Sequence, residues 1–413
     1  MKNIAALMTG TVLSQIIAIL TIPVLSRIYL PEDFGQLAVV MVFSNIAGVI
    51  LALRYEMALM LPKSDSLAFQ IMFKSIIIAI FMTLLEAMIL TILFDHFLEN
   101  YSIFFYVIIL CSFFNLFFQL STLWFNRQRK FKTSAYFAVF KVISIFGMQF
   151  LLSEQGNGMI YGYMYGNMII FFILFFIYLK DVKKIGINTS KLKLFYILKR
   201  YKKFPIYSVP ASLMNSSANN IQFILIEQLF GSASAGILSM LTRLIYAPAA
   251  LIGKTVNNVV FQHFTKEISH KKMIFDQMKK ITLFISAIGF LVIILILIIY
   301  KYNILIIILG ENWSEVNNLL IYFIPLIFTS IVSTSISRFA IFEKQEIGMY
   351  FQGFMLICVI TSVILGEAVT KNFQQTTILY SIILSLVFIL QLNISLYLAK
   401  NHDNKLKGKK NVK

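Results

Sequence analysis

Six ionisable side chains interrupt long apolar stretches of this sequence, and their chemistry needs an explanation. They are Lys74, Glu86, Lys141, Glu227, Arg243 and Lys254. A charge in hydrocarbon is expensive, so such a residue usually faces a charged partner or a water-filled cavity. Lys74 and Glu227 lie near the ends of their stretches, where their charged groups can reach the membrane surface. The other four are stronger candidates for a binding site.

Two of the cations can form one positively charged line on a single helix. Arg243 and Lys254 are eleven residues apart, and about 100° of rotation per residue on an α-helix returns them to within roughly 20° of one face. Lys141 lies about 10 Å of helical rise from the inner end of its own stretch and adds a third cation. The alternative is that each cation pairs with Glu86, Glu227 or a backbone carbonyl.

Amides and hydroxyls follow helical spacing in three further stretches. They are Asn115, Gln119, Thr122 and Asn126; Asn215, Asn219 and Gln222; and Ser330, Ser333, Thr334 and Ser337. Such stripes either form hydrogen bonds between helices or line a wet cavity, and the sequence leaves both interpretations open. A cavity that combines them with fixed positive charge would suit a glycan carried on a phosphate.

The sequence gives little support for a metal site or a nucleotide site. The four histidines lie in loops or tails and have no metal-ligand partner at helical spacing: His96, His263, His270 and His402. No phosphate-binding loop of the Walker A type occurs. Cys111 and Cys358 are expected to be packing residues, and Gly158, Gly162 and Gly166, each four residues from the next, predict close packing of helices. We therefore expect no metal and no cofactor.

The elements that must position these residues are membrane spans. The chain has 413 residues, of which 59% are hydrophobic and 13% charged, and this composition excludes an average soluble domain. A spanning helix needs about 20 apolar residues. The first apolar run continues past Pro23 without a cleavage site, so we expect a retained span rather than a signal peptide. Twelve windows qualify: 4–26, 34–56, 69–94, 102–125, 134–152, 158–180, 205–230, 235–262, 279–301, 316–341, 348–369 and 376–399.

The distribution of basic residues predicts the orientation. Lys and Arg concentrate in loops 127–132, 180–203 and 266–280 and in the tail from Lys400, whereas the alternate loops have few or none. The positive-inside rule therefore places both termini in the cytoplasm. Anionic membrane lipid then explains the net charge of +18, so we expect no nucleic-acid partner.

A long basic loop at the midpoint divides the sequence into two halves. We expect an N-terminal six-helix bundle over 1–180, a basic cytoplasmic connector over 181–204, a C-terminal six-helix bundle over 205–400 and a basic cytoplasmic tail over 401–413. The end of the connector, "LKLFYILKRYKK", has the pattern of an amphipathic helix on the membrane surface. Two halves of the same orientation would be related by an axis along the membrane normal, as in some transporters.

Three segments carry a resemblance to a known family. They are "LSRIYLPEDFGQLAVVMVFSNIAGVILALRYEMALMLP" (25–62), "YKKFPIYSVPASLMNS" (201–216) and "LFGSASAGILSMLTRLIYAPAALIGKTVNNVVFQHF" (229–264). Over roughly 1–270 the chain resembles polysaccharide exporters of the MOP flippase superfamily, while the last four helices match only in hydropathy. The resemblance implies an all-α polytopic membrane protein with about twelve transmembrane helices, arranged as two six-helix bundles around a central cationic cavity.

The resemblance also implies a function. The protein would be a flippase rather than an enzyme, and it would move an undecaprenyl-pyrophosphate-linked oligosaccharide across the bacterial cytoplasmic membrane for O-antigen, capsule or exopolysaccharide assembly. The motif "RYE" carries over as Arg54, Tyr55 and Glu56, and "LTRLIYAP" carries over as Arg243 and Pro248. For Arg54 and Glu56 the alternative is a membrane-surface anchor with its ion-pair partner. The expected partners are the lipid-linked oligosaccharide and membrane lipids, with a polysaccharide polymerase and a chain-length regulator as further candidates.

Two other functions compete with this one. A multidrug or cation extruder of the related branch would favour buried acids, but the predicted spans hold more Lys and Arg than Asp and Glu. An oligosaccharide polymerase would resemble proteins with a large outer catalytic loop, but the outer loops here are short. Without a nucleotide site, we expect an ion gradient or product removal to power transport, with Glu86 and Glu56 as proton-site candidates. The predicted substrate contacts are Arg243, Lys254, Lys141, Arg54, Asn115, Gln119, Asn215 and Asn219.

Overall fold

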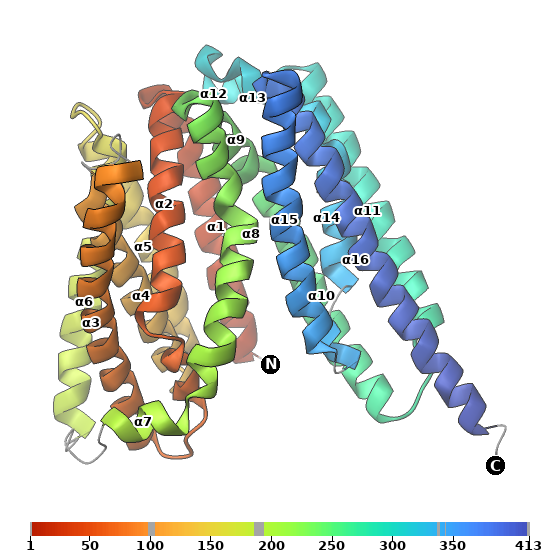
Figure 1. Cartoon of the computed structure of the whole chain (residues 1–413), viewed down its shortest axis with the longest axis horizontal. Coiled ribbons are helices and arrows are strands. Elements are labelled where there is room, and N and C mark those ends of the chain that lie inside the picture. The colour runs from red at the N-terminus through yellow and green to blue at the C-terminus, as the bar shows by residue number, and fades with distance from the viewer. Residues whose placement is uncertain (1, 98–103, 186–193, 337–338, 343, 411–413) are drawn as a thin grey trace. The chain divides into compact units, whose positions relative to one another are not determined.

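The computed structural model describes residues 2–97, 104–185, 194–336, 339–342 and 344–410. All regular elements in these ranges are helices (Figure 1), which confirms the predicted all-α fold class. Nine helices of the described chain are long and apolar enough to cross a membrane, and a shorter apolar helix lies near the N-terminus. The protein is therefore a polytopic membrane protein. Its chain divides into two compact units, Met1–Ser217 and Ala218–Lys413.

The first unit contains six long helices followed by a short one. Its elements are α1 (Lys2–Ile28), α2 (Pro31–Leu51), the 3-10 helix η1 (Tyr55–Met60), α3 (Asp65–Phe97), α4 (Phe105–Arg127), α5 (Phe131–Leu151), α6 (Gly158–Ile185), α7 (Leu194–Arg200), the π-helix η3 (Phe204–Ser208) and the beginning of α8 (Val209–Phe230). The boundary between the two units falls inside α8.

The second unit begins within α8 and has more broken helices. Its further elements are α9 (Ser232–Leu241), the π-helix η4 (Thr242–Tyr246), α10 (Ala247–Ser269), α11 (Phe275–Lys301), α12 (Ile304–Leu309), η5 (Glu311–Trp313), α13 (Ser314–Leu320), η6 (Ile321–Phe323), α14 (Ile324–Ile336), η7 (Phe339–Phe342), α15 (Gln345–Thr370) and α16 (Phe373–Lys410).

Helix covers most of the described part of each predicted window, but the windows 4–26, 205–230 and 235–262 are not among the nine candidate spans of the described chain. The structure also corrects several boundaries. The window 34–56 is too long, because α2 ends at Leu51 and the chain then turns through Leu53 and Arg54 at φ angles of 48° and 61°. The window 235–262 is not one regular α-helix, since η4 interrupts it. The window 316–341 is likewise divided by the 3-10 turn η6.

The start of α2 follows directly from its sequence. Pro31 occupies the first turn, where a missing N–H costs nothing. The backbone N–H of Leu30 donates to the carboxylate of Asp33 at 2.9 Å, and Glu32 and Asp33 place negative charge at the positive end of the helix dipole. The proline and the two acids therefore fix the turn between α1 and α2.

Small residues let the helices of the first unit approach closely. A Cβ atom added to Gly162 or Gly166 of α6 would clash with the backbone of α5 at Gln149 or Ile145. Gly10 of α1 similarly lies against α5. Without a hydrophobic driving force between helices in lipid, such close backbone contact is a main source of helix association. The prediction of close packing at the glycine series is confirmed.

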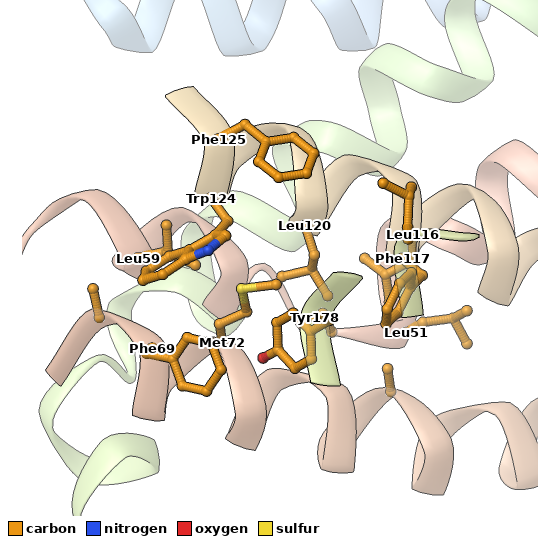
Figure 2. Close-up of a cluster of buried hydrophobic side chains, with 14 of the residues drawn as sticks. Leu51, Leu59, Phe69, Met72, Leu116, Phe117, Leu120, Trp124, Phe125 and Tyr178 are labelled. Atoms are coloured by element: carbon orange, nitrogen blue, oxygen red, sulfur yellow. The ribbon is translucent and has the colours of Figure 1, made fainter. Parts of the chain in front are cut away.

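The core of the first unit is aromatic (Figure 2). Phe69 of α3 contacts Trp124 of α4 edge to face, with ring centroids 5.1 Å apart, and stacks on Tyr178 of α6 at 4.9 Å. Leu51 and Leu59 bring the end of α2 and the helix η1 into the same cluster. The cluster therefore anchors the turn between α2 and α3 to three helices.

Hydroxyl and amide side chains hold the second unit together. Ser333 of α14 donates to Gln391 of α16 at 3.0 Å, and the amide of Asn257 in α10 donates to the backbone carbonyl of Thr334 at 2.6 Å. Gly253 gives α10 the space to approach Thr334. Of the described members of the α14 stripe, only Ser333 bonds to another helix through its side chain, whereas the hydroxyls of Ser330 and Thr334 donate to backbone carbonyls of α14 itself. Ser337 lies outside the described residues.

Candidate functional site

The "RYE" motif forms the start of η1, and each of its residues fastens this turn to another part of the first unit. The Arg54 guanidinium donates from Nε to the Ser212 hydroxyl of α8 at 3.0 Å. Arg54 also forms an ion pair with Glu56 at 3.2 Å. The Tyr55 hydroxyl donates to the backbone carbonyl of Leu198 in α7 at 3.3 Å. The motif therefore joins the α2–α3 turn to the segments on both sides of η3.

The ion pair of this motif is buried. The side chains of Arg54 and Glu56 are 15% and 2% exposed, so the expected alternative of a membrane-surface anchor fits them poorly. Arg54 Nη1 contacts Oε1 of Glu56, while Oε2 is buried and has no hydrogen-bond partner among the described residues. Burial raises the pKa of Glu56, and its own backbone N–H and Arg54 offset only part of this effect. The turn thus holds a carboxylate whose proton affinity is increased.

Backbone strain accompanies this arrangement. Leu53 and Arg54 both have positive φ angles, of 48° and 61°, and non-glycine residues adopt this left-handed conformation at a cost. Strain of this kind persists only where surrounding contacts hold it. Here the contacts are those of Arg54, Tyr55 and Glu56, and they direct the guanidinium toward α8.

A second polar group lies inside the first unit, around Lys141 of α5. Its ammonium donates to Oδ1 of Asn115 in α4 at 2.7 Å and lies 4.5 Å from the centre of the Phe118 ring. The Asn115 amide in turn donates to the Tyr163 hydroxyl of α6 at 3.1 Å. No carboxylate of the described chain pairs with Lys141, so the predicted alternative of an acidic partner does not apply to it.

The Lys141 group contains one member of the predicted stripe of α4. Asn115 belongs to it, but Gln119, one turn farther along α4, makes no hydrogen bond to another described side chain. Tyr163 was missed by sequence reasoning, because a tyrosine within an apolar helix gives no signal until the neighbouring helix is known. The three helices α4, α5 and α6 together build an internal site with a fixed cation, an amide and a phenol.

Glu86 lies apart from these cations. It lines an apolar cavity of about 320 Å³ between α2, α3 and α4, together with Ile50, Met82 and Ile108. Its hydrogen-bond partner is the buried hydroxyl of Ser112, which donates to Oε2 at 3.0 Å. The carboxyl therefore stands alone in apolar surroundings, without a basic partner among the described residues.

The second unit contains a small polar cavity of about 40 Å³. Asn219 and Gln222 of α8 line it from one side, and Thr242, Tyr246 and Tyr380 contribute hydroxyl groups. This volume has room for a buried water molecule. Asn215 is an exposed residue of α8 and belongs to the first unit, so the predicted stripe of α8 crosses the boundary between the units.

The predicted line of cations on one helix needs correction. Arg243 is the second residue of the π-helix η4, and Lys254 lies in α10. The assumed rotation of about 100° per residue applies to an unbroken α-helix, whereas a π-helical turn inserts an extra residue and changes the face. The premise that placed both residues on one face is therefore wrong. The side chain of Lys254 lies outside the described residues, and its substrate role stays a prediction.

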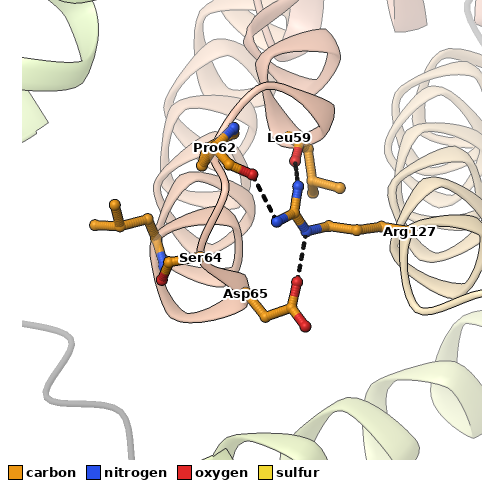
Figure 3. Close-up of polar contacts among 6 residues, drawn as sticks. Leu59, Pro62, Ser64, Asp65 and Arg127 are labelled. Atoms are coloured by element: carbon orange, nitrogen blue, oxygen red, sulfur yellow. Dashed lines mark hydrogen bonds and ion pairs between the residues drawn. The ribbon is translucent and has the colours of Figure 1, made fainter.

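Arg127 is a structural residue that the sequence did not single out. At the end of α4 it donates from Nε to Asp65 at 3.0 Å, from Nη1 to the Leu59 carbonyl at 2.9 Å and from Nη2 to the Pro62 carbonyl at 2.7 Å (Figure 3). Two of these partners are backbone atoms, so side-chain spacing could not predict them. The guanidinium thus binds the carbonyls at the C-terminal end of η1, and Arg54 lies at the N-terminal end of the same helix.

Comparisons with known proteins agree with this architecture. Residues 24–318 match the model of a family described as "Polysaccharide biosynthesis protein". No curated protein matches the chain.

Three solved structures are similar over nearly the whole chain. The lipid II flippase MurJ, in an inward closed conformation, matches with a TM-score of 0.70 and 15% sequence identity. The match covers 97% of this chain and 91% of the MurJ chain. The eukaryotic MATE transporter AtDTX14 matches with a TM-score of 0.60 and 13% sequence identity. The match covers 98% of this chain and 97% of the AtDTX14 chain. An inward-facing multidrug resistance MATE transporter of the MOP superfamily has a TM-score of 0.59 and 12% identity over 96% of both chains. At these identities the likenesses establish the fold alone.

Proposed function

Because this chain belongs to the polysaccharide biosynthesis protein family, we propose that it is a flippase for a lipid-linked oligosaccharide. The cargo would be an undecaprenyl-pyrophosphate-linked repeat unit of O-antigen, capsule or exopolysaccharide, moved across the cytoplasmic membrane by alternating access. The MOP-superfamily fold supports transport, and one protein with this fold is named as a flippase for lipid II.

The observation that carries the proposal is Lys141, a partly buried cation of α5 without an acidic partner among the described residues. An ammonium has three N–H donors, and Asn115 accepts one of them at 2.7 Å. The other two remain for phosphate oxygens, while Tyr163 and Asn115 offer the hydroxyl and amide groups that sugars bind. A cation kept inside a membrane bundle without an acidic partner is costly, and such residues usually mark a substrate pathway.

Replacement of Lys141 by methionine tests the proposal. Methionine keeps a similar volume and removes the charge. We expect transport to fall by about tenfold or more, because one charge-assisted hydrogen bond to the substrate is lost. The measurement uses proteoliposomes with a lipid-linked oligosaccharide in both leaflets and follows how much becomes accessible to an impermeant glycosidase. The charge that is removed is partly buried and has no acidic partner among the described residues, so the loss of its hydrogen bond to Asn115 should change the thermal stability of the variant only slightly.

Two controls make this test specific. Lys141→Arg keeps the charge and should retain part of the transport, and Lys279→Gln removes an exposed charge of α11 and should retain all of it. If Lys141→Met transports as well as the unchanged protein, Lys141 is not a substrate contact. If the unchanged protein does not accelerate exposure of the oligosaccharide at all, the flippase proposal fails.

Glu86 supports a second candidate, a cation extruder. A lone carboxyl in an apolar cavity of about 320 Å³ would suit an apolar cation, and two of the similar structures are MATE transporters. Under this function, cells that lack the protein become more sensitive to cationic dyes, Glu86→Gln does not restore resistance, and the surface glycan is unchanged. Under the flippase function, the glycan is lost and dye sensitivity is unchanged.

The flippase proposal also includes proton coupling, with Glu86 and Glu56 as candidate proton sites. An imposed pH gradient across the proteoliposome should accelerate transport by the unchanged protein. If Glu86 carries the proton, Glu86→Gln should transport at one rate with and without the gradient, while Glu56→Gln still responds; the reverse pattern assigns the proton to Glu56. A transport rate of the unchanged protein that does not depend on the gradient contradicts both assignments.

A further inference from the structure

The short helix α7 lies at the end of the first unit and runs crosswise to α3 and α6 (Figure 1). Its residue Leu198 and the following Tyr201 and Phe204 pack on a small apolar cluster that contains Tyr55 and Ile71. The hydrogen bond from Tyr55 to the Leu198 carbonyl adds to this contact. The helix is therefore held against η1 and the start of α3.

A pocket of about 540 Å³ lies between α7 and the turn that follows η1. Its aliphatic wall consists of Leu61, Leu67 and Ile71, and its cations are Lys63 on the turn and Arg200 on α7. No acidic side chain of the described chain is among the residues that line it. The pocket thus offers an apolar surface beside two positive charges.

Aromatic side chains fix the position of Arg200. Its guanidinium donates from Nη1 to the Tyr196 hydroxyl at 2.6 Å and lies 5.8 Å and 5.7 Å from the ring centres of Tyr196 and Tyr201. A guanidinium has five N–H donors, so most of them remain available to an anion, and the Tyr196 hydroxyl keeps its own proton to donate. Fork-shaped donors of this kind bind phosphate oxygens well.

The position of the pocket indicates which anion it would bind. The candidate membrane span of α3 begins at Asp65, two residues after Lys63, so the pocket lies beside the end of a candidate span. Leu61 is 60% exposed, which is unfavourable in water but not against acyl chains. Further exposed cations, Lys199, Lys202 and Lys203, flank the pocket along the chain. Cytoplasmic membrane surfaces are negatively charged and attract such clusters.

We propose that this pocket binds the phosphate head group of an anionic membrane phospholipid, such as phosphatidylglycerol, with its acyl chains against the leucine wall. Arg200 and Lys63 bind the phosphate from two sides, and Leu61 and Leu67 contact the glycerol and the first methylene groups. A bound lipid would bridge α7 and the turn after η1. This site is separate from Lys141 and does not depend on the identity of the transported cargo.

Lipid binding to the purified, delipidated full-length protein tests the proposal. Native mass spectrometry would compare phosphatidylglycerol with phosphatidylcholine, for which we expect at least about tenfold weaker binding. The double variant Lys63→Gln, Arg200→Gln should lose about thirtyfold in affinity for phosphatidylglycerol, because each basic residue near an anionic surface contributes about a factor of five. The matched control Lys271→Gln, Lys280→Gln removes two exposed charges from the second unit and should bind as the unchanged protein does.

Three results would overturn the proposal. They are equal binding of the two lipids, an equal loss in the control variant, and full competition by inorganic phosphate, which would indicate a soluble anion instead. If the double variant does not fold, the unchanged protein can be cross-linked to a photoactivatable phosphatidylglycerol. We then expect the cross-links within 61–71 and 196–201. Cross-links elsewhere only would also contradict the site.

Discussion

At the scale of single residues, the "RYE" motif gives Glu56 an increased proton affinity. Its carboxylate is buried, one oxygen contacts Arg54 at 3.2 Å, and the other has no hydrogen-bond partner among the described residues. A buried oxygen without a partner costs free energy when the group is ionised. Protonation relieves this cost, so the folded protein holds the proton of Glu56 more tightly.

The pH dependence of stability tests this view of Glu56. Burial raises its pKa in the folded protein, so the folded state holds the proton more tightly than the unfolded state. Stability should therefore decrease as the pH rises from the ordinary Glu value of 4.5 through the raised value. Glu56→Gln lacks this decrease, so its melting temperature relative to that of the unchanged protein should rise as the pH increases above 4.5.

The control for this comparison is Glu154→Gln, because Glu154 is exposed between α5 and α6. Its melting temperature should follow that of the unchanged protein at every pH. Parallel curves for Glu56→Gln and the unchanged protein would show that Glu56 does not titrate differently in the folded state.

At the scale of elements, prolines explain where the two π-helices occur. Pro210 follows η3 by two residues, and Pro248 follows η4 by the same number. A proline cannot donate to the carbonyl four residues earlier, and its ring crowds that carbonyl. A π-helical turn just before the proline changes the hydrogen-bond pattern and relieves the conflict. The π-helical turn η4 contains Arg243.

The packing of α6 on α5 predicts a large effect of one small substitution. Gly162→Val places a branched side chain against the backbone of Gln149, and overpacking of this kind costs about 1–3 kcal/mol. We expect a clearly lower melting temperature of the purified protein in detergent. At Gly147 of α5 an added Cβ meets no atom within 4 Å, so Gly147→Ala should be neutral or stabilise by about 0.5–1 kcal/mol. Equal effects of the two substitutions would contradict the packing.

Arg127 predicts an effect on the η1 turn. Arg127→Ala leaves Asp65 and the carbonyls of Leu59 and Pro62 without their donor, and loss of charge-assisted hydrogen bonds costs about 2–3 kcal/mol. Chemical denaturation should show this loss. Arg127→Lys should recover only part of it, because a lysine lacks the fork that reaches three acceptors. A variant Arg127→Ala as stable as the unchanged protein would mean that the contacts of Arg127 add nothing.

At the scale of the whole molecule, the chain comprises two compact helical units, and the division falls within α8 at 217/218. The density of basic residues predicts the connector earlier in the chain, over 181–204. Residues 186–193 of that connector lie outside the described residues. The helices α7 and η3, which follow them, pack on the first unit through Tyr55 and its neighbours.

Topology reporters test the predicted orientation of the whole chain. With both termini in the cytoplasm, a fluorescent protein fused to the C-terminus should fluoresce, and alkaline phosphatase inserted into 153–157 should be active. Phosphatase inserted into the basic loop 127–132 should be inactive, because positive charge is retained on the inner side. The opposite pattern at these sites would invert the proposed orientation.

The sequence by itself determined the fold class, the nine predicted spans that the described residues support and the resemblance to the family, because hydropathy and helical period are local properties. It also predicted the close packing at Gly162 and Gly166, since small residues at a spacing of four have one main use in a membrane helix. Only the tertiary structure decided which polar groups meet. Lys141 with Asn115 and Arg54 with Ser212 join residues 26 and 158 positions apart, and Arg127 binds backbone carbonyls that no side-chain pattern records. Such contacts depend on how helices pack against one another, and a local pattern does not contain that information.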